Sequence, residues 1–154
     1  MISILPYLTK ERVIDLKSQN KMEVLREMAE IAVNENIRED VETLYDELLD
    51  RERLMSTGIG IGIAVPHARC PETDTFTIAI GRSLEGIRYD SVDGKPVNLV
   101  ILIIAPGSDR REYLQLLAKV VMRLKDREFY QKLMDAPTPG DIYDIIAADS
   151  AENA

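Results

Sequence analysis

Residues 51–68 have the sequence RERLMSTGIGIGIAVPHA, the most informative pattern in the chain. From Ile59 to Val65, branched apolar residues alternate with glycine and alanine, which predicts a strand with one nearly bare face. Pro66 fixes its own φ angle and biases Val65 toward extended geometry. We therefore expect the strand to stop at Pro66 and to present His67, the only histidine, at its end.

Five helices are predicted from apolar residues at helical spacing and from polar residues that start a helix. They are expected over residues 20–34, 40–53, 108–124, 126–133 and 138–146. Their starts lie at Asn20, Asp40, Ser108 or Asp109, Asp126 and Thr138. Each helix has one apolar face, which a sheet or another helix has to cover.

Three further segments have strand patterns. Val13–Leu16 is short, Thr75–Arg82 is longer, and Val97–Ala105 is almost wholly apolar, as expected for a central strand covered on both faces. Asp93 and Gly94 mark a turn before the last of these strands. Helices before, between and after strands indicate an α/β fold, a mixed β-sheet sandwiched by helices.

The composition fits one globular domain. The chain has 154 residues, of which 45% are hydrophobic and 30% charged, and it contains no repeat or linker-like segment. We expect a single domain over residues 1–148 and a frayed tail over residues 149–154.

The charge and the apolar runs limit the partners. A formal net charge of -8 argues against nucleic acid or an anionic membrane and favours basic partners. The longest apolar run, residues 99–106, is too short to cross a bilayer, and the first eight residues lack a leader pattern. We expect a cytoplasmic protein without membrane insertion.

His67 is the main candidate for chemistry. One cysteine cannot form an intramolecular disulfide, and one cysteine with one histidine cannot build a zinc cage, so no metal or cofactor is predicted. Imidazole suits a labile phosphoryl group, because one ring nitrogen can attack while a hydrogen bond to the other fixes the tautomer. A lone histidine is also an ordinary structural or surface residue, and both interpretations stay open at this point.

Glycines precede the histidine. Gly58, Gly60 and Gly62 allow close approach of a phosphate, a partner backbone or a helix, and they are equally compatible with a turn. Their spacing is not the G-x-G-x-x-G of a dinucleotide loop, and no G-K-S or G-K-T follows. A nucleotide cofactor is unsupported.

A longer motif is more specific. Arg51 and Glu52, then residues 56–60, then residues 62–67 together resemble the active-site signature of the enzyme IIA domains of the bacterial phosphotransferase system, fructose/mannitol/nitrogen-regulatory type (type 2). Weaker similarity extends over nearly the whole chain. The resemblance implies a mixed sheet flanked by helices, a phosphoryl group carried on Nε2 of His67, and the carrier HPr or its nitrogen-branch relative as donor.

The resemblance also implies roles around the histidine. Arg51 matches an arginine that offsets phosphoryl charge, and Ser56 and Thr57 match positions whose hydroxyls can bind phosphate oxygens, although a capping or turn role stays open for both. Tyr113 stands where members commonly carry a second histidine. It can donate one hydrogen bond but cannot become a cation near neutral pH, and it is equally compatible with simple packing of a helix.

Nearby polar residues have plainer interpretations. Asp50, Glu52 and Arg53 are expected on the solvated surface of their helix, where Glu52 can steady an arginine. Cys70 is expected to be a small buried residue.

Three functions are compatible with this resemblance. The leading one is a phosphotransferase-type carrier with a nitrogen-type regulatory role, favoured because no fused HPr, IIB or membrane IIC segment is present in 154 residues. The alternatives are a sugar-specific IIA that passes phosphate to a IIB domain, and a IIA-like binding module that has lost phosphotransfer. The expected partners are HPr or an HPr-like carrier, with a IIB domain or regulated proteins as further candidates, and an acidic chain would suit a basic carrier.

Overall fold

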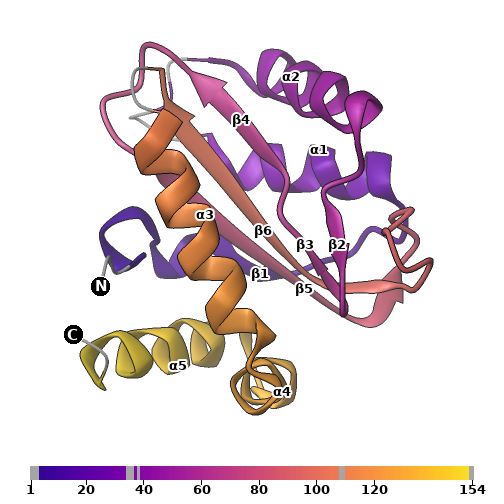
Figure 1. Ribbon diagram of the computed structural model, residues 1–154, viewed down its shortest axis with the longest axis vertical. Coiled ribbons are helices and arrows are strands. Elements are labelled where there is room, and N and C mark those ends of the chain that lie inside the picture. Colours follow the sequence, from indigo (N-terminus) through magenta and orange to yellow (C-terminus); the bar gives the residue numbers. More distant parts are fainter. Residues whose placement is uncertain (1–3, 34–36, 38, 108–109, 153–154) are drawn as a thin grey trace.

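The structure is a computed structural model that describes residues 4–33, 37, 39–107 and 110–152. Within these residues, a six-stranded mixed sheet has the strand order β1-β5-β6-β3-β2, and β4 also pairs with β6. Helices cover both faces of this sheet (Figure 1). The predicted α/β fold with a mixed sheet between helices is confirmed.

The strands and helices have these bounds. The strands are β1 Val13–Asp15, β2 Gly58–Gly60, β3 Ile63–Ala64, β4 His67–Cys70, β5 Thr77–Ile87 and β6 Val97–Pro106. The helices are α1 Lys21–Ala32, α2 Val41–Leu54, α3 Arg110–Lys125, α4 Arg127–Asp135 and α5 Pro139–Glu152, preceded by the short 3-10 turns Leu5–Tyr7 and Lys10–Arg12.

The helix starts follow local capping. The Asn20 side chain accepts a hydrogen bond from the Glu23 backbone N–H at 3.1 Å, and Asp40 accepts one from Thr43 at 2.8 Å. Asp126 likewise caps α4. These predicted starts are confirmed, and the first helix ends at Ala32, two residues before the predicted end. Ser108 and Asp109 lie outside the described residues.

The central strand β6 divides the core into two halves. Leu99, Ile101 and Ile103 pack with α3, α4 and α5 on one face, while the residues between them pack with α1 and α2 on the other. This double coverage explains why the strand is almost wholly apolar, as predicted. Cys70 is buried in the half under α1 and α2, also as predicted.

The glycine-rich stretch forms a hairpin, so the prediction of one strand over residues 59–65 is wrong. β2 and β3 are antiparallel, and the chain reverses between them with positive φ at Gly60 (94°), Ile61 (53°) and Gly62 (81°). Glycine adopts such angles without steric cost, so two of the three positions suit the turn. Gly60 and Gly62 therefore form the turn of a hairpin and not the bare face of a long strand.

Strand β3 ends at Ala64, before Pro66, but His67 starts a new strand and does not lie at the end of the old one. β4 begins at His67, and β3 and β4 run in one unbroken register beside β6, with Ile63 opposite Leu99 and His67 opposite Ile103. Pro66 has no N–H and interrupts the ladder there, although its carbonyl accepts from Ile103 N at 3.0 Å. His67 thus begins a strand that pairs with β6, and this pairing holds its backbone in place.

The C-terminal helix is longer than predicted. α5 continues to Glu152 instead of ending at Ile146, because Asp149 accepts from Arg123 of α3 at 2.9 Å (Nε) and 2.5 Å (Nη2). Residues 149–152 are therefore helical and not a frayed tail. Among the described residues, every helix is too short or too polar to cross a membrane.

Candidate active site

His67 lies at the start of β4 with its side chain half-buried. Its Nδ1 lies 3.4 Å from the Val65 carbonyl oxygen. A proton on Nδ1 satisfies that contact and leaves Nε2 unprotonated, as a hydrogen-bond acceptor. The backbone around Pro66 thereby selects the tautomer in which Nε2 can attack.

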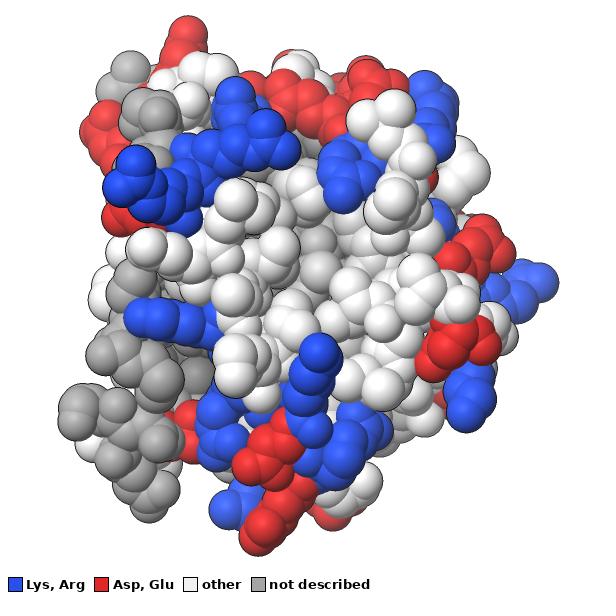
Figure 2. Space-filling view, in the orientation of Figure 1, with Lys and Arg blue, Asp and Glu red and all other residues white. Residues whose placement is uncertain are grey.

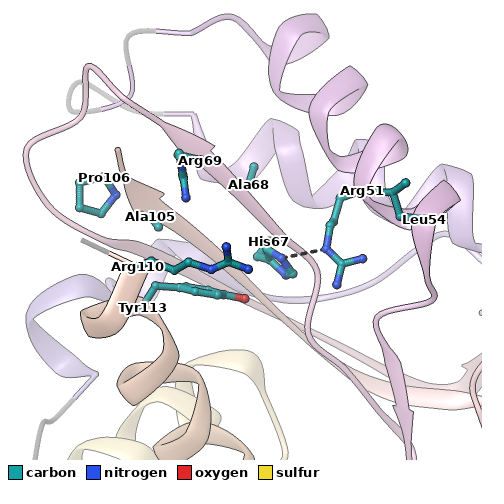
Figure 3. Close-up of a pocket in the computed structure, with 9 residues that line it drawn as sticks. All are labelled: Arg51, Leu54, His67, Ala68, Arg69, Ala105, Pro106, Arg110 and Tyr113. Atoms are coloured by element: carbon teal, nitrogen blue, oxygen red, sulfur yellow. Dashed lines mark hydrogen bonds between the residues drawn. The ribbon is translucent and has the colours of Figure 1, made fainter. Parts of the chain in front are cut away.

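Arg51 reaches the same ring from the last turn of α2. Its Nε donates to His67 Nε2 at 3.0 Å, and its Nη1 donates to the Met55 carbonyl at 3.1 Å (Figure 3). The second bond fixes the guanidinium at the end of the helix. The structure thus brings Arg51 and His67 together, as the sequence motif predicts.

The surroundings keep the imidazole neutral. Burial lowers the pKa of His67, and the positive charge of Arg51 lowers it further, against opposing effects from the Val65 carbonyl and Glu52. A neutral ring with an unprotonated Nε2 is the form that acts as a nucleophile. The ring is therefore neutral near neutral pH, with Nε2 unprotonated.

A pocket of about 340 Å³ opens beside the ring. Its lining residues are Arg51, Leu54, His67, Ala68, Arg69, Ala105, Pro106, Arg110 and Tyr113. Figure 3 shows Arg51 on one side of His67 and Arg110 with Tyr113, both from α3, on the other. Three arginines and a neutral imidazole suit a small anion such as a phosphoryl group.

Comparison with known proteins identifies the family. Residues 7–149 match the model of the family described as "Phosphoenolpyruvate-dependent sugar phosphotransferase system, EIIA 2". This chain belongs to the EIIA 2 family.

Individual EIIA 2 relatives cover most of the chain. It is 31% identical over 147 residues to a "Nitrogen regulatory protein" of Pseudomonas aeruginosa, covering 95% of this chain and 96% of that protein. It is 32% identical over 120 residues to the "PTS system fructose-specific EIIA component" of Haloferax volcanii, covering 78% of each. The crystal structure of the nitrogen regulatory protein IIA-Ntr from Neisseria meningitidis superposes with a TM-score of 0.86 at 27% identity, covering 93% of this chain and 98% of that one.

Tyr113 gives this EIIA 2 site a free hydroxyl. Its ring centroid lies 5.1 Å from that of His67 at an interplanar angle of 40°. Its hydroxyl oxygen is buried and has no hydrogen-bond partner among the residues that the structure describes. Burial raises the pKa of Tyr113 to about 12, so the hydroxyl keeps its proton near neutral pH. Tyr113 also packs against the hydrophobic core. Its position is therefore compatible both with a hydrogen bond to a phosphate and with simple packing of the helix.

Ser56 and Thr57 do not line the pocket of this EIIA 2 chain, in contrast to the expected phosphate-binding role. Ser56 Oγ accepts from the Gly58 backbone N–H at 3.1 Å and from Lys21 Nζ at 3.4 Å. Thr57 is buried, and its hydroxyl bonds with Glu52 and Tyr89. Both hydroxyls are occupied in shaping the loop after α2, which is the turn role left open above.

Glu52 is buried, so its expected place on the solvated surface is wrong. Its carboxylate accepts from the Thr57 N–H at 3.1 Å and from the Tyr89 hydroxyl at 3.2 Å, and it pairs with Lys21 at 2.9 Å. These contacts anchor the end of α2, one residue after Arg51. Asp50 and Arg53 form an exposed pair, as predicted.

The face around the pocket is basic, although the whole chain is acidic. Its nine lining residues include three arginines and no acid. Figure 2 shows blue side chains, with red ones among them, around a broad uncharged centre. Leu54, which lines the pocket, is 82% exposed. The pocket lining therefore offers positive charge, although the chain as a whole is acidic.

Arg69 and Arg110 line the pocket but were missed in the sequence. Arg69 lies two residues after His67, so the alternation of a strand places both side chains on one face. Arg110 lies in the first turn of α3, where its positive charge is unfavourable beside the positive end of the helix dipole. An arginine at such a position suggests a role other than helix stability. Both signals were present, but each depends on first recognising β4 or the start of α3.

Proposed function

We propose that this EIIA 2 chain accepts a phosphoryl group on His67 Nε2 from the phosphohistidine of an HPr-like carrier and acts as a cytoplasmic regulatory protein of the nitrogen type. The observation that carries this proposal is the geometry of the ring. Nε2 is unprotonated, lies 3.0 Å from Arg51 Nε, and faces a pocket lined by two further arginines.

The transfer step needs no outside oxidant or metal. The Nε2 lone pair attacks phosphorus, the bond between phosphorus and the donor's ring nitrogen breaks, and the donor imidazole keeps that electron pair. Positive charge grows on the His67 ring, where the Val65 carbonyl faces Nδ1 at 3.4 Å. Arg51 then donates to a phosphoryl oxygen in place of Nε2, so that its positive charge stabilises the negative charge of the phosphoryl group during transfer.

The regulatory role is supported by the relatives. The P. aeruginosa nitrogen regulatory protein aligns over nearly the full length of both chains. The H. volcanii fructose-specific component is equally similar in identity, so the second candidate is a sugar-specific IIA that passes its phosphoryl group to a IIB domain. The unpartnered Tyr113 hydroxyl argues against a module that has lost transfer, because it offers a donor in the pocket.

The test is a label-transfer experiment. The chain and its His67→Ala variant are incubated with labelled phosphoenolpyruvate, enzyme I and HPr, and acid-labile label on the chain is measured. We expect label on the wild type and none on the variant. Absence of label from the wild type would overturn the carrier function.

A second step separates the two roles. The labelled chain is purified and mixed with a fructose-type IIB domain. Retained label supports regulation, whereas rapid loss to the IIB domain supports sugar transfer. Addition of unlabelled HPr is the control, because reversible return of the label shows that the carrier is still competent.

A further inference from the structure

Three potential metal ligands meet on the far side of β4 from the pocket. One carboxylate oxygen each of Glu39 and Glu47 and the Sγ of Cys70 all lie within 4.8 Å of one another. Glu47 belongs to α2, Glu39 lies just before that helix, and Cys70 ends β4, which lies beside α2 (Figure 1). His67 lines the pocket and Cys70 faces the helix, so the cluster is separate from the phosphoryl site.

Buried polar atoms in this cluster find no hydrogen-bond partner outside it among the described residues. They include the Oε2 atoms of Glu39 and Glu47, and the two carboxyl groups contact each other. The Oγ1 atom of Thr73, a residue only 3% exposed, also has no partner outside the cluster among the described residues. It faces the Cys70 thiol, and this contact acts to lower the pKa of that thiol. Buried polar groups are satisfied in more than nine cases of ten, so several unsatisfied atoms in one place indicate a ligand.

The two carboxyl groups repel each other when both are ionised. Burial and the neighbouring Glu39 raise the pKa of Glu47 to about 7, and burial with Glu39 raises that of Cys70 to about 12. Among the described residues, no lysine or arginine forms an ion pair with either carboxylate. A shared proton would relieve the carboxyl pair but would leave the Thr73 hydroxyl unsatisfied.

We propose that Glu39, Glu47 and Cys70 bind a zinc-class divalent cation, with the Thr73 hydroxyl beside the fourth position. A thiolate combined with carboxylate oxygens is a ligand set for zinc, whereas magnesium and calcium prefer oxygen alone. Binding would release the thiol proton and any proton held between the carboxyl groups. Both glutamates are partly exposed, which gives the ion a path from solvent.

The bound ion would tie β4 to α2. Glu47 lies four residues before Arg51, on the same side of the helix. The proposal rests on the cluster alone and does not depend on phosphotransfer. Its failure would therefore leave the proposed function of His67 untouched.

The test uses Cd²⁺ and Zn²⁺ with the purified full chain stripped of metal. Cd²⁺ bound to a thiolate gives an ultraviolet charge-transfer band, and Cys70 is the only thiol. We expect one Cd²⁺ per chain with this band, and its displacement by Zn²⁺. The variants are Cys70→Ser, Glu47→Gln and Glu39→Gln, with Asp46→Asn on the exposed face of α2 as the matched control.

Each outcome decides the proposal. Cys70→Ser should abolish the band, and each glutamine variant should weaken binding by at least about tenfold, since even residues that only orient metal ligands cost 10- to 100-fold. Both glutamine variants mimic a protonated carboxyl group, so they should keep the fold, which circular dichroism checks. No saturable band in the wild type, or wild-type affinity in both glutamine variants, would overturn the site.

Discussion

Replacement of Arg51 by methionine should slow phosphorylation of His67 without unfolding the protein. The guanidinium donates to His67 Nε2 at 3.0 Å, so a phosphoryl group on that atom would place opposite charges about 4–5 Å apart. At an effective dielectric of about 20 this attraction is about 3–4 kcal/mol. Because Arg51 is partly exposed, we take about half, 1.5–2 kcal/mol, which is a rate loss of about 10- to 30-fold.

The matched control is Arg53→Met. Arg53 lies two residues further along α2, is 73% exposed and pairs with Asp50 at the surface. Its rate should stay within about twofold of the wild type. The assay is rapid-quench measurement of label transfer with phosphorylated HPr in excess. A wild-type rate for Arg51→Met would refute the reasoning, and an equal loss in Arg53→Met would assign the effect to the general charge of the helix end.

Three further changes test other parts of the site. Tyr113→Phe should change the free energy of unfolding by less than about 0.5 kcal/mol, because the hydroxyl has no hydrogen bond to lose among the described residues. It should slow phosphoryl transfer about tenfold. Equal transfer rates in the variant and the wild type would exclude a hydrogen bond from Tyr113 to phosphate. Glu52→Gln should lower the free energy of unfolding in urea by about 2–3 kcal/mol, since it breaks the buried ion pair with Lys21. The control Glu42→Gln, at an exposed ion pair, should lower it by less than about 0.5 kcal/mol. Equal losses in the two variants would contradict a stabilising role for the buried Glu52 carboxylate. The pKa of His67 should lie below the ordinary value of about 6.5. The unfolded chain then binds more protons than the folded chain, so the free energy of unfolding falls as the pH drops below that value. An NMR titration that gives His67 a pKa at or above about 6.5 would contradict the burial argument.

Much of the fold was predictable because its signals are local. Asn20, Asp40 and Asp126 cap helices by contacts within three residues, and strand β6 shows its double burial in its own composition. The hairpin over residues 58–64 was missed because alternating isoleucine and glycine has the same period in a strand and around its turn. Only the positive φ angles, which the sequence does not display, distinguish the two.

The site was predictable at Arg51, His67 and Tyr113, all of which line the pocket, and not beyond. Glu52 and Arg53 both look like helix surface, and only the fold brings Tyr89 and Lys21 to Glu52. Arg82 is similar, since this fully buried side chain on β5 donates to carbonyl groups at the end of α4. Such contacts join residues 31 to 54 positions apart, and no local pattern reports them.

The most direct measurement is two-dimensional ¹H–¹⁵N NMR of the imidazole before and after phosphorylation by labelled HPr. Because His67 is the only histidine, its two ring nitrogens can be assigned without ambiguity. We expect phosphorus coupling at Nε2, with Nδ1 keeping the position set by the Val65 carbonyl. Coupling at Nδ1, or an imidazole spectrum unchanged by the donor, would contradict a phosphoryl group carried on Nε2 of His67.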